Sequence, residues 1–442
     1  MQKYVVRALL AFAALFVGVA SQPALAQNEL FVANAGNNSV TVFSRTASGN
    51  TAPIRTLVGA ATGLFTPQAL AVDVANNELF VAIGVGPAIN VYSLNASGNT
   101  APLRTLTGSA TGMGQPIYLA LDATNNELFV ANALNQTITV YSRTASGNTA
   151  PLRTLSTVPA GNTPFGLTLD LTNNELVVGT SGSTIDVYTR TASGNTAALR
   201  TLGGALTGLM GPIGLGVDLT NNELFAANLS VSSPSVTVYS RTASGNTAPL
   251  RTLSGALTGL VGPHALALDL PNNELFVGNT INANSITVYT RDASGNTAPL
   301  RTLRGALTGI SGPVGVAVTQ SAIGATLDVD ASLTATKYDA LTDGLLVIRY
   351  LFGLTGPALT TGALGITATR TDAGVIKAYL DGIRLALDID GNGSTDAPTD
   401  GLLIIRYLFG LRGDALIAGA VDPLATRHTA PDIEAYLQTL MP

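Results

Sequence analysis

Oxygen-bearing side chains alternate with small or apolar residues in one short stretch near the C-terminal end of the chain. Counted from Asp388 as position 1, oxygen donors stand at positions 1, 3, 5 and 9, and Gly393 stands at position 6. Calcium takes roughly six to eight oxygen ligands, and a glycine at the sharp turn lets a short loop aim its donors at one point. The stretch therefore predicts a calcium site. The alternative is a solvated acidic turn in which Asp400 caps a helix.

The elements that would position these oxygens belong to a duplicated unit. Residues 342–346, 348–354, 368–370 and 378–380 match residues 399–403, 405–411, 425–427 and 435–437, each at an offset of 57. Each unit reads as loop, helix, glycine-containing turn and helix. Leu402, Ile405 and Phe409 fall at i, i+3 and i+7, which predicts one buried helix face.

The duplicated segment resembles dockerin-type and related EF-hand modules, in which two loop-helix units pair. For the second unit, the resemblance implies ligands at Asp388, Asp390, Asn392, Ser394 (through its backbone carbonyl), Asp396 and Asp400. Asp400 stands at position 13 and the family's acid at position 12, so either the loop has an extra residue or Asp400 reaches the ion by a different route. Residues 397 and 398 occupy positions at which dockerins usually carry recognition residues, so cohesin binding does not carry over.

The first unit departs further from that pattern. Leu333 replaces the glycine, and Asp339 comes three residues late. We therefore expect a weaker or irregular first calcium site, built from Asp328, Asp330, Asp339 and Asp343.

A longer repeat fills the part of the chain before this segment. The tripeptide Asn-Glu-Leu begins at residues 28, 77, 126, 174, 222 and 273, and Ser-Gly-Asn also recurs six times. Each repeat parses into four short strands; in the last complete one these are residues 266–269, 274–278, 285–290 and 299–303. Four strands in about 45 residues are typical of a propeller blade.

The two ends of the repeat region decide between a closed ring and an open stack. The region begins at a second strand, residues 29–33, and stops after a first strand, residues 314–319. Each end alone is an incomplete blade, and together they make one. The sequence therefore predicts a mainly β protein: a six-bladed β-propeller with a split closing blade, followed by a small all-α domain.

The repeats resemble the NHL and YVTN propeller repeats of bacterial surface and exported proteins. The residues that carry the resemblance are 28–34 and the matching runs, each followed by Thr-Val-Phe or Thr-Val-Tyr. The resemblance covers about 290 residues. It implies the fold and says little about function, because such repeats occur in enzymes, scaffolds and binding proteins.

Differences between the repeats separate scaffold from candidate binding surface. The loops joining strands 1–2 and 3–4 barely vary, whereas the loops joining strands 2–3 differ in every blade. Loops that differ between blades are where a ligand-binding surface would be built. The alternative is that these surface loops have diverged by drift and bind nothing. The residue after each blade's proline should line the channel mouth, unless it only packs the inner strands; these residues are Gln68, Ile117, Phe165, Ile213, His264 and Val314.

Catalytic residues are hard to find in the repeats. His264 is their single histidine, no nucleophile elbow is present, and we assign no catalytic residue. The repeated Asp residues that end each first strand suit Asx turns, and the repeated Glu and Arg are expected to pair within or between blades. The chain has no cysteine, which excludes thiolate chemistry.

The N-terminal segment has the order of a secretory signal. Lys3 and Arg7 precede an apolar run, residues 8–20, and a small-residue cleavage box at 24–26. We therefore expect export to the periplasm, cell surface or medium and no membrane span. The expected organisation is a signal peptide at 1–26, the propeller at 27–320, a linker at 321–326 and the helical domain at 327–442.

Charge limits the partners. Residues 27–320 carry 13 acidic and 12 basic side chains, and residues 321–442 carry 14 and 8, so nucleic acid is not an expected partner. The leading hypothesis is an exported, non-catalytic binding or scaffold protein whose propeller face holds a glycan or protein ligand and whose calcium module attaches to a partner protein or stabilises the tail. The alternatives are a propeller enzyme (a lyase, lactonase or glycan-degrading protein) and a structural surface or matrix component.

Overall fold

The computed structural model describes residues 28–156, 162–270, 272–281, 283–319, 326–332, 337–423 and 425–441. The predicted signal peptide lies outside the described residues, as does the predicted linker except Thr326. No helix in the described part of the chain is long and apolar enough to cross a membrane.

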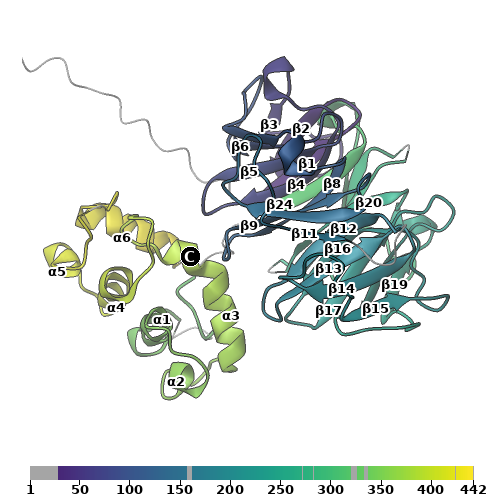
Figure 1. Cartoon of the computed structure of the whole chain (residues 1–442). Helices are drawn as coiled ribbons and strands as arrows, with labels where there is room; N and C mark the ends of the chain where they lie inside the picture. The colour runs from purple at the N-terminus through teal and green to yellow at the C-terminus, as the bar shows by residue number, and fades with distance from the viewer. Residues whose placement is uncertain are drawn as a thin grey trace, which may run out of the picture.

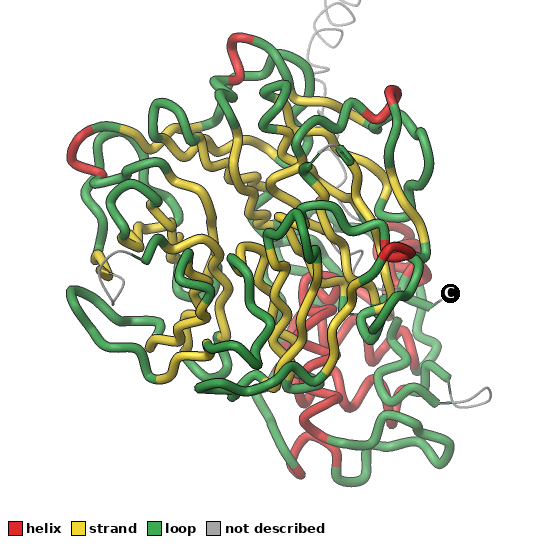
Figure 2. The backbone as a smooth tube through the Cα atoms, turned by 90° about the vertical axis from the view of Figure 1, so that its right-hand side faces the viewer, coloured by secondary structure: helices red, strands yellow, loops and turns green. Residues whose placement is uncertain are grey.

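Six four-stranded antiparallel sheets form a ring of blades (Figures 1 and 2). Blade 1 contains β24 (Pro313–Thr319), β1 (Glu29–Asn34), β2 (Ser39–Ser44) and β3 (Arg55–Leu57). Blades 2 and 3 contain β4 (Pro67–Asp73), β5 (Glu78–Ile83), β6 (Ala88–Ser93), β7 (Arg104–Thr107), β8 (Pro116–Asp122), β9 (Glu127–Asn132), β10 (Thr137–Ser142) and β11 (Arg153–Ser156). Blades 4 to 6 contain β12 (Pro164–Asp170), β13 (Glu175–Thr180), β14 (Thr184–Thr189), β15 (Arg200–Gly203), β16 (Pro212–Asp218), β17 (Glu223–Asn228), β18 (Ser235–Ser240), β19 (Arg251–Ser254), β20 (Pro263–Asp269), β21 (Glu274–Asn279), β22 (Ser285–Thr290) and β23 (Arg301–Leu303).

The predicted closure of the ring is confirmed. Strand β24 pairs with β1 from Glu29↔Thr319 to Ala33↔Gly315, so the last strand of the propeller is the inner strand of the first blade. The six-bladed fold and its split blade follow from this pairing.

Strand boundaries differ from the predicted ones by more than one residue at two places. The inner strand of blade 6 begins at Pro263, three residues before the predicted 266, because the pairing continues past a register shift between Pro263 and Ala265. The outer strand begins at Arg301 and not at 299, because proline has no N–H to donate to the neighbouring strand.

A repeated clasp covers part of the outer edge of each blade. Gly98 in the Ser-Gly-Asn turn of blade 2 donates its N–H to Thr56 O (2.7 Å) on the outer strand of blade 1, and Val58 N–H donates back to Gly98 O (2.9 Å). Gly98 has φ +61°, a conformation that favours glycine. Equivalent bridges form at all six interfaces, including Gly49 with Leu303. The repeated turn therefore protects edge strands, which otherwise invite aggregation.

The apolar core lies between neighbouring blades. One cluster joins Phe31 and Val42 of blade 1 to Val81 and Tyr92 of blade 2, and similar clusters join the other neighbours. Each blade thus buries both faces of its sheet against the next blade.

The C-terminal segment folds as two similar helical units around one core. The first contains a π-helical turn η6 (Ala340–Gly344), α1 (Leu345–Leu351), α2 (Pro357–Thr360) and α3 (Ala373–Ile383). The second follows the short turn η7 (Arg384–Leu387) and contains η8 (Ala397–Gly401), α4 (Leu402–Leu408), α5 (Asp414–Ile417) and α6 (Ala430–Thr439).

The predicted buried face of the first helix of the second unit is wrong. Leu403, Ile404 and Tyr407 face the core, whereas Phe409 is 56% exposed. Residues 402–405 are all apolar, so periodicity does not select a face. The face is set by packing of the two units against each other, where Gly401 lies against Ile348 and Leu351 of the first unit.

Candidate functional site

Repeated ion pairs concentrate at one end of the blades, which we call the constant face because its 1–2 and 3–4 turns barely vary. In blade 3, Glu127 accepts two hydrogen bonds from Arg153 (2.5 and 2.8 Å), and Arg190 of blade 4 reaches both Glu127 and Asp122 (3.2 Å to the latter). The hydrogen bond from Arg153 is the main reason that the pKa of Glu127 is lowered. The predicted structural pairing of the repeated Glu and Arg residues is confirmed.

The aspartates at the ends of the first strands have two structural roles. Asp122 Oδ1 accepts a hydrogen bond from Asn125 N–H (2.9 Å), three residues along the chain and so one residue further than in the predicted Asx turn. Its other oxygen faces Arg190 of the next blade, a contact that the sequence analysis did not anticipate. The carboxylates are therefore occupied by structural partners.

Five of the six interfaces carry this Asp–Arg pair. The exception is the interface between blades 1 and 2. There Thr319 stands in place of Asp, Leu94 stands in place of Arg, and both are 1% exposed. The acid and its partner are thus replaced together, as expected if neither charge is tolerated alone at this buried position.

The opposite end of the blades, which we call the variable face, is formed by the 2–3 and 4–1 loops. These loops contain one charged residue in the described part of the chain, the exposed Arg304. Asp186 lies within strand β14, is 1% exposed, and accepts a hydrogen bond from Thr201 Oγ1 (2.6 Å). Charge is therefore segregated to the constant face.

The six predicted mouth residues occupy one register position, directly after the proline that begins each inner strand at the variable-face end. Ile213 is buried, and the others (Gln68, Ile117, Phe165, His264 and Val314) are half-buried. His264 Nδ1 lies 3.0 Å from Val314 O on the next blade, which indicates that Nδ1 carries the proton. Burial lowers the pKa of His264 to about 4, so its imidazole is neutral at pH 7.

Sequence reasoning missed Tyr118 on the inner strand of blade 3. It follows Ile117 on β8, at a position where the other five inner strands carry glycine or alanine: Ala69, Gly166, Gly214, Ala265 and Gly315. Its hydroxyl interacts with the backbone of Leu215, two blades away on β16, and burial raises its pKa to about 12. The sequence signal for Tyr118 was a large residue at a position where the other five inner strands carry small ones.

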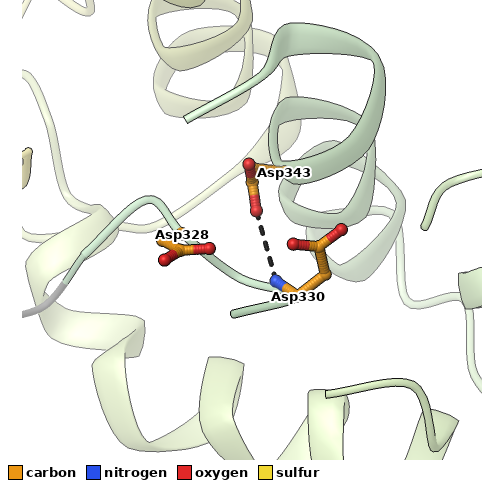
Figure 3. A group of neighbouring side chains, drawn as sticks. All are labelled: Asp328, Asp330 and Asp343. Atoms are coloured by element: carbon orange, nitrogen blue, oxygen red, sulfur yellow. Dashed lines mark hydrogen bonds between the residues drawn. The ribbon is translucent and has the colours of Figure 1, made fainter. Parts of the chain in front are cut away.

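Two carboxylate clusters form in the helical module, one in each unit. Oxygens of Asp328, Asp330 and Asp343 lie within 4.8 Å of one another, as do those of Asp388, Asp390 and Asp400. Figure 3 shows Asp343 pointing from its helical turn toward the backbone of Asp330, with Asp328 nearby. In each cluster the last two residues are 0% exposed.

The last acid of each cluster also organises its loop. Asp400 Oδ1 accepts hydrogen bonds from Ile389 N–H (2.6 Å) and Asp390 N–H (3.3 Å), and Oδ2 accepts from Asp396 N–H (3.0 Å). Burial raises the pKa of Asp400 to about 6, and that of Asp343 likewise to about 6. Ion pairs among the described residues involve none of these carboxylates. A donor set of converging, desolvated carboxylate oxygens suits a hard cation.

The shape of the turn accounts for the extra loop residue. Gly401 N–H bonds to Asp396 O (3.0 Å), five residues back, and Gly344 N–H bonds to Asp339 O (3.1 Å) in the first unit. This π-helical turn is wider than an α-helical one, so Asp400 reaches the cluster from position 13.

Two of the predicted acidic ligands do not belong to the carboxylate clusters. Asp339 and Asp396 cap the helical turns, accepting hydrogen bonds from Leu341 N–H (2.7 Å) and Thr399 N–H (2.9 Å). Asn392 Oδ1 accepts from Ser394 N–H (2.6 Å). The structure therefore brings together six of the eight predicted acidic ligands.

In the comparisons with known proteins, the matching family model is that of a propeller. A family model described as "Lactonase, 7-bladed beta-propeller" matches residues 30–165, less than half of the chain. No curated protein matches. Similar solved structures include a nidogen/laminin complex (17% identity, 66% of this chain, 98% of that chain, TM-score 0.48) and the WD40 β-propeller domain of Doa1 (13%, 67%, 87% and 0.43).

Proposed function

We propose that the protein is an exported, non-catalytic binding or scaffold protein that meets its ligand through the variable face of the propeller. The ligand is an uncharged surface, either a glycan or a protein. The C-terminal module is a calcium-stabilised unit that docks onto a partner protein.

The observation that carries the proposal is the segregation of charge. The Glu, Arg and strand-ending Asp residues of the propeller pair with one another at the constant face, with side chains at most 18% exposed. The diverged loops gather at the other face, where Arg304 is the one charge in the described part of the chain. An uncharged surface favours an uncharged ligand, because a charged one would lose hydration without gaining a partner.

The two carboxylate clusters support the calcium part of the proposal. Asp328, Asp330 and Asp343 would hold one ion, and Asp388, Asp390 and Asp400 would hold the other. The ion would supply the positive charge that the buried carboxylates lack and would stabilise the folded module by binding to it preferentially.

A lactonase-like enzyme is the second candidate, because the matching family model is so described. His264 would be the base in such an enzyme. A pKa of about 4 makes it a weak base at pH 7, and the other five blades carry Gln68 and four apolar residues at the position of His264. The channel mouth therefore favours binding over catalysis.

The experiment that tests the proposal is a paired screen of the full chain against neutral and charged glycans and against lactones. Binding without turnover, insensitive to ionic strength, supports the binding role. Lactone hydrolysis that His264→Gln abolishes would replace it with the enzymatic role. Residues 1–26 are tested separately, by fractionating the producing cells and sequencing the N-terminus of the protein; a cytoplasmic protein that retains Met1 would remove the export claim.

A further inference from the structure

One arginine of the helical module holds the backbone of the second acidic loop, which begins at Asp388. Arg427 Nε donates to Ile389 O (2.6 Å), and its Nη2 donates to Asp388 O. The backbone N–H of Arg427 donates to Asp390 O (2.8 Å). Three successive carbonyl groups at the start of the loop are therefore bonded to a single residue from the segment before α6.

The neighbouring threonine extends this contact by one residue. Thr426 Oγ1 donates to Gly391 O (2.9 Å), the next carbonyl along the loop. Gly391 has φ +73°, and a Cβ at this position would lie 2.2 Å from Thr426 Oγ1. Thr426 and Arg427, which we call the second clamp, thus bond to the carbonyl groups of four consecutive loop residues.

The second clamp and the carboxylate cluster hold the same stretch of backbone through different groups. Asp400 Oδ1 accepts from the N–H groups of Ile389 and Asp390, whose carbonyl groups accept from Arg427. Both residues therefore have their N–H and C=O groups bonded within the chain. This arrangement fixes the backbone from which the carboxylates of the cluster project.

The first unit has an equivalent clamp, Thr369 and Arg370, although its loop is spaced differently. Arg370 donates from its side chain to Val329 O and from its backbone N–H to Asp330 O (2.8 Å), and Thr369 Oγ1 donates to Ala331 O (2.9 Å). The two arginines are 57 residues apart, whereas the aspartates that begin the two loops are 60 residues apart. The same contacts form in both units despite the different spacing, so they do not follow from loop length alone.

Each clamp arginine stacks on a tyrosine of the helix that follows it. Arg427 Cζ lies 4.0 Å from the ring centroid of Tyr436 on α6, and Arg370 Cζ lies 3.8 Å from that of Tyr379 on α3. Stacking restricts the planar guanidinium, so it loses less freedom when it bonds to the loop. Burial raises the pKa of Asp388, while the positive charge of Arg427 acts to lower it, so this charge reaches the carboxylate cluster.

We propose that Arg427 and Arg370 are positioning residues for calcium, each holding its loop in the shape that aims the carboxylates at one point. The inference rests on the proposed function, because it assigns a role at the calcium sites proposed there. A loop that is already formed loses less conformational freedom on binding and so binds its ion more tightly. Charge alone gives the opposite expectation, since removing a positive group beside the site would strengthen calcium binding.

Calorimetric titration of the full chain with calcium separates these two expectations. Arg427→Lys keeps the charge and Arg427→Met removes it, and both should weaken binding at the second site by about tenfold or more. The matched control is Arg406→Lys. Arg406 is half-buried in the same unit and donates to Leu416 O (3.0 Å) and Ala418 O (2.9 Å), which lie outside the loop, so its change should leave both calcium affinities unaltered.

Amide hydrogen exchange in EDTA gives a second readout that needs no calcium. The N–H groups of Ile389 and Asp390 donate to the carboxylate cluster and should be protected in the wild type. In Arg427→Lys they should exchange about tenfold faster or more, because the loop opens more often without its carbonyl contacts. The control variant should exchange as the wild type does, and equal exchange in all three proteins overturns the inference.

Thr426→Val is a milder variant that removes one hydrogen bond and keeps the shape of the side chain. It should change both readouts in the same direction by about threefold, and it decides the question if circular dichroism shows that the Arg427 variants are unfolded. Calcium binding by Arg427→Met that equals or exceeds that of the wild type overturns the inference and leaves the proposed calcium site standing. Equal weakening by the control also overturns it. A folded wild type that takes up no calcium overturns both the inference and the proposed calcium site.

Discussion

The Asp–Arg pairs between blades allow a double-mutant test that the chain itself suggests. Arg190→Leu removes the partner of Asp122, whose side chain is 0% exposed, while Glu127 keeps Arg153. An uncompensated buried carboxylate costs about 3 kcal/mol or more. The second substitution, Asp122→Thr, then recreates the Thr319 and Leu94 combination that the interface of blades 1 and 2 carries naturally.

The double variant should recover about 2 kcal/mol of the loss. Recovery is incomplete because the double variant still lacks the hydrogen bonds from Asn125 to Asp122 and from Arg190 to Glu127 and Asn174, each worth about 1 kcal/mol. Urea unfolding followed by far-ultraviolet circular dichroism measures the free energy of unfolding of each variant. The exposed Arg304→Leu is the control and should change it by less than about 0.5 kcal/mol. A coupling energy below about 0.5 kcal/mol between the two sites would refute the reasoning.

Three further predictions concern buried or clustered titratable groups. Burial raises the pKa of Asp186, so the folded protein gains stability as pH falls from neutral toward the pKa of the unfolded state. Asp186→Thr should therefore stabilise the protein at pH 7, and a lower free energy of unfolding in urea would contradict this. Burial lowers the pKa of His264 from 6.5 to about 4, so the folded protein loses about 3 kcal/mol of stability as pH falls through that range. This loss should be absent in His264→Gln. If the variant and the wild type lose stability equally as pH falls, His264 is not the cause. In calorimetric titration with calcium, Asp388→Ala should show one binding event fewer than the wild type. The control Asp414→Ala changes an exposed acid of the same unit and should show the same binding events as the wild type. Identical heats for the two variants would contradict a calcium site in the second unit.

Much of the propeller could be predicted from the sequence because its turns are local. Each Asn-Glu-Leu begins with an Asn at positive φ, and each Ser-Gly-Asn turn contains a Gly at positive φ. Both residue types mark the boundary of a strand, and both depend only on their neighbours in the chain. The closure of the ring followed from counting strands at the two ends of the repeat region. Strand β24 does pair with β1.

What could not be predicted depends on contacts between distant elements. The reach of Tyr118 to Leu215 requires the ring geometry, and the buried face of α4 requires the packing of the second unit on the first. The spacing of the acids predicted which residues lie in each loop, but not which of them join the carboxylate cluster and which cap the helical turn. Asp339 and Asp396 became caps because a π-helical turn follows each of them.

Amide hydrogen exchange of the full chain with and without a bound neutral glycan or protein tests the central claim most directly, since that claim is that the variable face makes the protein's contacts. Slower exchange with the ligand bound should be confined to the 2–3 and 4–1 loops of the variable face. Slower exchange in the Ser-Gly-Asn turns of the constant face, with the variable loops unchanged, would contradict the account.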